Sequence, residues 1–196
     1  DRLAIFDQLI KLEDKDLWTI SGKTNYAYTK LFLNKLSVFD ETLFIDVDTA
    51  WCGHKDVNDL FKECEKYDFI IKNRNYYDYK NKETNDGSPL WFWVDEQKVG
   101  KEYAVKSGRL YSVHAELFYF KKGKITDDVF ETAKEVANDV KVESQLKWSN
   151  QNNCDEVPLS ISILLNKVNM PVGFNPVHWY QSDGQFLSRK QMFEEY

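Results

Sequence analysis

The sequence predicts an α/β fold with a mostly parallel central sheet flanked by helices. The chain has 196 residues, enough for one domain with a sizeable core. Short apolar runs that are typical of buried strands occur at 42–45 and 67–71. Segments with helical spacing of apolar residues lie before, between and after these runs. Strands that alternate with helices in this way are typical of βαβ units and a parallel sheet.

The first elements follow from the spacing of apolar residues. A stripe between residues 3 and 12 predicts a short helix, and a second helix is predicted over 25–36. The strand at 42–45 is expected to end at Asp46. Asp56 has the character of an N-cap, and the apolar residues after it predict a helix that leads to the strand at 67–71.

The second half of the chain continues the pattern after an interruption. Residues 72–106 are rich in Asn, Asp and Tyr and predict a long irregular loop excursion, with a short strand over 91–94. A long strand is predicted over 109–120. An amphipathic helix is predicted over 127–140, and a further helix is predicted from about 153 to 168.

Composition narrows the class of protein. We expect one domain over residues 1–196, ending in a polar tail at 172–196. A net charge of -6 argues against a general nucleic-acid surface. No apolar run approaches the roughly 20 residues that span a bilayer. Three widely spaced cysteines argue against a disulfide scaffold and favour a reducing compartment, so a cytoplasmic location is expected.

The strongest local signal is Asp46-Val47-Asp48 at the end of the first buried strand. Side chains at positions i and i+2 of a strand share one face, so both carboxylates can approach one cation. Carboxylate oxygens suit a hard divalent cation such as Mn²⁺ or Mg²⁺. The alternative interpretation is an Asp-rich turn after a strand, because so short a motif has a high false-positive risk.

The segment Tyr26-Ala-Tyr-Thr-Lys30 through Leu43-Phe-Ile-Asp46-Val-Asp48 resembles the nucleotide-sugar glycosyltransferases of the GT-A fold. The resemblance implies a nucleotide-sugar donor, with a UDP-sugar favoured, and an Asp-x-Asp metal site. It implies that Asp48 binds the metal directly and that Asp46 binds it through water or holds the ribose. Lys30 would order the Asp pair or steady a phosphate, unless it is simply a solvated lysine.

Two later segments extend the resemblance. Val113-His-Ala-Glu116-Leu-Phe-Tyr-Phe is similar to the strand that borders the sugar pocket in that family, although Ala115 and Glu116 depart from its usual residues. Asn153-Cys-Asp155-Glu156 is similar to its acidic helix start. The resemblance implies that Asp155 or Glu156 contacts a sugar, and one of them is a candidate general base. The alternative is helix capping, since Asn153 and Glu156 are spaced like a capping box.

Two further residues are candidates for the same site. His178 follows the last predicted helix, where the family commonly takes a third metal ligand. The alternative is a histidine packed beside Trp179. Trp51 lies just after Asp48 and would stack on a sugar or cap the core. Residues 1–24 do not resemble the nucleotide-binding start of the family, so that part is expected to be missing from the chain or diverged.

The sequence therefore predicts a metal-dependent glycosyltransferase that moves a hexosyl or pentosyl unit to an acceptor left open. One alternative is a haloacid-dehalogenase-like phosphatase, which shares the strand followed by Asp-x-Asp. Its motif expects Thr or Val where Ala50 stands. Another alternative is a non-catalytic carbohydrate- or protein-binding domain that uses the aromatic residues of 72–106 as its surface.

Overall fold

A computed structural model describes residues 19–20, 23–24, 26–46, 56–90, 95–139 and 155–176. Its main sheet has four strands in the order β3-β6-β4-β5. These strands are β3 (Glu41–Ile45), β6 (Arg109–Lys121), β4 (Phe69–Asp78) and β5 (Glu83–Thr84). A separate hairpin joins β1 (Thr19–Ile20) to β2 (Lys23–Thr24).

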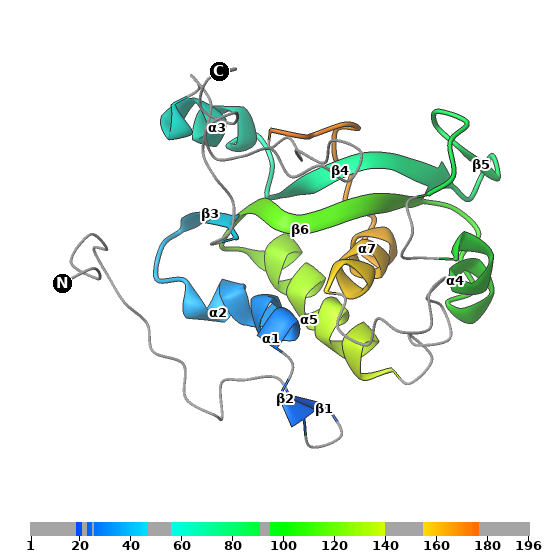
Figure 1. The fold of residues 1–196 in the computed structure, drawn as a ribbon, viewed down its shortest axis with the longest axis horizontal. Helices are drawn as coiled ribbons and strands as arrows, with labels where there is room; N and C mark the ends of the chain where they lie inside the picture. The colour runs from blue at the N-terminus through cyan, green and yellow to red at the C-terminus, as the bar shows by residue number, and fades with distance from the viewer. Residues whose placement is uncertain are drawn as a thin grey trace, which may run out of the picture.

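The predicted mostly parallel, GT-A-like sheet is wrong. All strand pairs of the described residues are antiparallel, β3 with β6, β6 with β4 and β4 with β5. The alternation of elements was informative in one respect, because β3 and β4 run in the same direction on either side of β6. They are not neighbours, however, since the later strand β6 lies between them and runs the opposite way (Figure 1).

Most of the helices in the described residues lie at positions where the sequence predicts a helix. The segment predicted as one helix over 25–36 forms α1 (Tyr26–Thr29), η3 (Lys30–Phe32) and α2 (Leu33–Leu36). The remaining helices are α3 (Val57–Cys64), α4 (Glu96–Glu102), α5 (Lys124–Asn138) and α7 (Glu156–Leu165). Asp56 caps α3, as predicted, by accepting a 2.9 Å hydrogen bond from the Asn58 backbone. Within the described ranges, no helix is long and apolar enough to cross a membrane.

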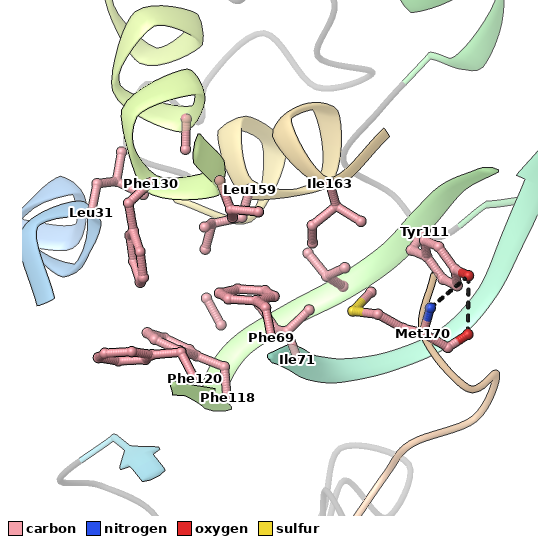
Figure 2. Close-up of a cluster of buried hydrophobic side chains, with 14 of the residues drawn as sticks. Leu31, Phe69, Ile71, Tyr111, Phe118, Phe120, Phe130, Leu159, Ile163 and Met170 are labelled. Atoms are coloured by element: carbon pink, nitrogen blue, oxygen red, sulfur yellow. Dashed lines mark hydrogen bonds between the residues drawn. The ribbon is translucent and has the colours of Figure 1, made fainter. Parts of the chain in front are cut away.

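The sheet is covered on both faces. Helices α5 and α7 and the segment from α1 to α2 lie on one face, and α3 lies on the other (Figure 1). The larger core fills the space between the sheet and α5 and α7. Figure 2 shows its aromatic and aliphatic side chains meeting there, among them Leu31, Phe69, Phe118, Phe130 and Leu159. A smaller cluster packs under α3, around Leu60, Cys64 and Tyr119.

Residues 72–106 are more regular than the sequence indicates. The structure forms the second half of β4, the β5 hairpin and α4 within this range. Some of the residues that suggested a loop are buried, whereas Asn81, Asn85 and Asp86 are exposed. Asn75 is buried and donates hydrogen bonds to Asp86 and to two backbone carbonyls. Tyr77 and Tyr79 are buried in a cluster with α4. The predicted strand at 91–94 lies outside the described residues.

Gly100 in α4 marks a close contact that the sequence does not reveal. A Cβ at this position would lie 2.7 Å from Cε1 of Tyr79. That ring is held in place, since its hydroxyl donates a 2.8 Å hydrogen bond to the Glu96 carbonyl. We expect Gly100→Ala to lower the free energy of unfolding by about 1 kcal/mol in urea denaturation, because the overpacking outweighs the better helix propensity of alanine. In a helix with room for the added Cβ, Gly→Ala raises the free energy of unfolding by about 1 kcal/mol. Such an increase for Gly100→Ala would contradict this contact.

Candidate functional site

A break in the regular pairing of β6 creates the candidate site. Pairing between β4 and β6 shifts register between Ile71 and Lys72, where the partner on β6 changes from Phe118 to His114. Pairing with β3 ends nearby, with the Asp46 backbone N–H donating a 2.8 Å hydrogen bond to the carbonyl of Glu116. Such irregularities re-aim side chains and are common next to functional sites. Here they bring the end of β3, the middle of β6 and the start of α7 together.

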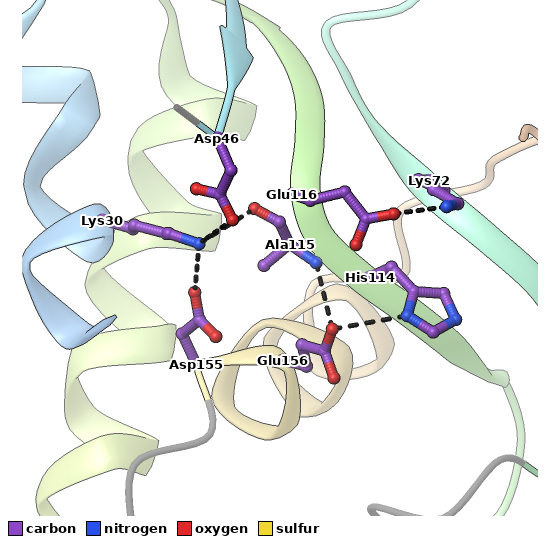
Figure 3. A network of polar contacts seen from close by, with 8 residues as sticks. All are labelled: Lys30, Asp46, Lys72, His114, Ala115, Glu116, Asp155 and Glu156. Atoms are coloured by element: carbon purple, nitrogen blue, oxygen red, sulfur yellow. Dashed lines mark hydrogen bonds and ion pairs between the residues drawn. The ribbon is translucent and has the colours of Figure 1, made fainter. Parts of the chain in front are cut away.

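Lys30 links two acidic residues from distant parts of the chain (Figure 3). Its ammonium group lies 2.8 Å from Oδ2 of Asp46 and 3.2 Å from Oδ2 of Asp155. It also donates a 3.3 Å hydrogen bond to the carbonyl of Ala115. The three charged side chains are mostly buried, with 21% of Lys30, 27% of Asp46 and 11% of Asp155 exposed.

Burial sets the protonation behaviour of this group. Burial raises the pKa of Asp155 to about 6, with a contribution from neighbouring Glu156, although Lys30 acts in the opposite direction. Burial also disfavours the charged form of Lys30, but the Asp155 and Asp46 carboxylates outweigh it and leave its pKa above the usual value. A carboxyl group with a pKa near 6 can exchange a proton near neutral pH, which suits acid–base chemistry.

Glu156 turns away from Lys30 and faces the other side of the site. Its Oε1 accepts a 3.3 Å hydrogen bond from the Ala115 backbone N–H and lies 3.4 Å from Nδ1 of His114. Glu116 forms an ion pair with Lys72, whose side chain is only 3% exposed. Figure 3 shows these side chains grouped around the middle of β6.

The structure brings together three of the residues that the sequence singled out. Lys30 and Asp46 are in contact, and Asp155 completes the group through Lys30. Glu156 lies beside them but contacts a different set of residues. The capping alternative is not seen for Asp155, because its side chain makes no capping hydrogen bond at the start of α7. Asp48, Trp51 and His178 were also candidates, and all three lie outside the described residues, as does Asn153.

Sequence reasoning missed the second half of the site. The sequence predicts no role for His114 or Lys72, and Glu116 is a departure from the family's usual strand. One signal was present, because His114 and Glu116 stand at i and i+2 in the stretch 113–120, whose other residues are apolar or aromatic. Their contact with Glu156 could not be predicted without the register shift in β6.

Comparison with known proteins identifies no relative. No protein-family model and no curated protein matches the sequence, and no solved structure matches the fold. The function therefore has to be inferred from the chemistry of the site itself.

Proposed function

We propose that this chain is a metal-dependent glycosyltransferase that moves a hexosyl or pentosyl unit from a nucleotide sugar to an acceptor. The observation that supports it is the meeting of Lys30, Asp46 and Asp155. Lys30 and Asp46 come from one segment that resembled such an enzyme and Asp155 comes from a second, and the two segments are far apart in the sequence. The antiparallel sheet gives no support, so the proposal depends on the site alone.

Asp46 has the properties that a hard divalent cation requires. Its carboxylate oxygens stand at the end of β3, and its side chain is partly exposed. One of these oxygens contacts Lys30, so Asp46 and the sequence neighbour Asp48 would hold Mn²⁺ or Mg²⁺ through the remaining oxygens or through water. When bound, the metal would neutralise the negative charge that develops on the departing nucleoside diphosphate.

Lys30 and Asp155 would contact the same nucleotide-sugar substrate directly. The ammonium of Lys30 fixes the orientation of Asp46 and contributes a positive charge beside the expected diphosphate. Asp155 is the better placed of the two acidic candidates to contact the transferred sugar, because Lys30 connects it to Asp46. Glu156 faces His114 instead.

The test is a screen of nucleotide sugars for release of nucleoside diphosphate, beginning with UDP-sugars, in the presence of Mn²⁺. We expect turnover that a chelator removes and that Mn²⁺ restores. Asp46→Asn keeps the shape of the side chain but weakens the metal site and the contact with Lys30. We therefore expect it to lower turnover at least about 100-fold.

The matched control is Asp59→Asn, which makes the same chemical change on the exposed surface of α3. It should leave turnover unchanged. Undiminished turnover in Asp46→Asn, or none with any donor, would contradict the proposed function. Hydrolysis of a simple phosphate monoester that Asp46→Asn abolishes would favour the phosphatase alternative instead.

A further inference from the structure

His114, Glu116 and Glu156 form a group of side chains whose chemistry differs from that of the Asp46 site. One imidazole nitrogen and two carboxylate oxygens from these residues lie within 4.8 Å of one another. His114 and Glu116 come from the irregular stretch of β6, and Glu156 comes from the first turn of α7 (Figure 3). We propose that these three residues bind a divalent transition-metal ion of the zinc type.

The distances suit coordination better than a simple ion pair. Nδ1 of His114 lies 3.4 Å from Oε1 of Glu156. A charge-assisted hydrogen bond between such groups is normally about 2.8 Å long. With metal–ligand bonds of about 2.1 Å, two ligand atoms of a tetrahedral zinc site lie about 3.4 Å apart. A carboxylate oxygen of Glu116 lies within 4.8 Å of a ligand atom of each of the other two residues.

The donor set selects the class of metal. Imidazole nitrogen suits Zn²⁺ and its neighbours Co²⁺ and Ni²⁺, whereas Mg²⁺ and Ca²⁺ prefer oxygen ligands throughout. One histidine and two carboxylates also make a set of three protein ligands, the number found in zinc sites that keep a fourth position for water or substrate.

Neighbouring groups hold two of the ligands in orientation. The Ala115 backbone donates to Oε1 of Glu156, and the buried ammonium of Lys72 pairs with Glu116. A carboxylate has two oxygens with about four acceptor positions, so a residue that makes such a contact can also be a metal ligand. Outer partners of this kind fix the geometry of metal ligands in known sites.

Cobalt(II) provides a direct test, because its visible absorption reports both binding and ligand geometry. The full chain is stripped with a chelator and titrated with Co²⁺, and Zn²⁺ is then added in competition. We expect a Co²⁺ spectrum of low coordination number that Zn²⁺ abolishes. We also expect the apparent melting temperature to rise by several degrees in Zn²⁺, because the ion binds only the folded chain.

Three variants locate the site. Loss of even an outer partner of a metal ligand lowers metal affinity about 10–100-fold. We therefore expect Co²⁺ affinity to fall at least about 100-fold in each of three variants, His114→Ala, Glu116→Gln and Glu156→Gln. The two Glu→Gln variants keep the side-chain shape, so a folding defect in His114→Ala does not remove the test. Glu83→Gln on the exposed β5 is the matched control and should bind Co²⁺ as the unaltered chain does.

Asp46 belongs to the proposed transferase site and is not one of the three proposed ligands. We therefore expect Asp46→Asn to leave this Co²⁺ spectrum intact. Equal Co²⁺ affinity in the unaltered chain and in His114→Ala and Glu156→Gln would overturn the proposal. So would a Co²⁺ spectrum that is lost only in Asp46→Asn, or an unaltered chain that binds neither Co²⁺ nor Zn²⁺. In that last case His114 and Glu156 would form an ion pair only.

Discussion

Phe118→Ala is expected to lower the free energy of unfolding by about 4 kcal/mol. Phe118 is fully buried on the central strand β6. Its ring lies 4.7 Å from that of Phe44 on β3, 6.2 Å from that of Phe69 on β4 and 6.2 Å from that of Phe130 on α5. Removing it leaves a cavity between two strand neighbours and a helix, and truncations of this kind cost about 3–5 kcal/mol. The melting temperature should fall by roughly 10 °C.

Urea denaturation followed by circular dichroism measures this loss, with Phe39→Ala as the matched control. Phe39 is 63% exposed in the turn before β3, so the same truncation should change stability by less than about 0.5 kcal/mol. A loss of under about 1 kcal/mol for Phe118→Ala would mean that the core around β6 is not packed as described.

The positions of most described elements could be predicted, because burial leaves a periodic trace in the sequence. The strand at 109–120 and the helix at 127–140 correspond closely to β6 and α5. Strand direction leaves no such trace when both faces of a strand are buried. The succession of β3, α3 and β4 along the chain is that of a parallel βαβ unit. The sheet is antiparallel because β6, which comes later in the sequence, lies between β3 and β4 and runs opposite to both.

Only part of the candidate site could be predicted from the sequence. Asp46 was singled out because the Asp-x-Asp pair follows a buried strand, whereas Lys30 and Asp155 were singled out by the resemblance to glycosyltransferases. The group of His114, Glu116 and Glu156 depends on a register shift in β6. A shift of this kind is decided by long-range pairing, so the residue spacing that predicts regular strands does not reveal it.

Lys30→Met is expected to lower the free energy of unfolding by about 3 kcal/mol at about pH 8, where Asp155 is ionised. The substitution keeps the length of the side chain but removes the only charge that the structure places between Asp46 and Asp155 among the described residues. Two mostly buried carboxylates are then left facing each other without compensation. Removing one partner of a buried ion pair costs about 3–5 kcal/mol, and the partial exposure of Asp46 places this case at the lower end.

A double-mutant cycle separates this electrostatic effect from packing, because Lys30 also lies over the ring of Phe44. Asp155→Asn alone should change stability by less than about 1 kcal/mol, because it keeps the side-chain shape and leaves Lys30 paired with Asp46. Combined with Lys30→Met, it should recover about 1–3 kcal/mol. Lys35→Met, on the exposed side of the same helical segment, should unfold at the same urea concentration as the unaltered chain. If the losses from Lys30→Met and Asp155→Asn simply add, Lys30 stabilises the fold through its other contacts, with Asp46 and the Ala115 carbonyl, and its charge does not hold Asp155 in the site.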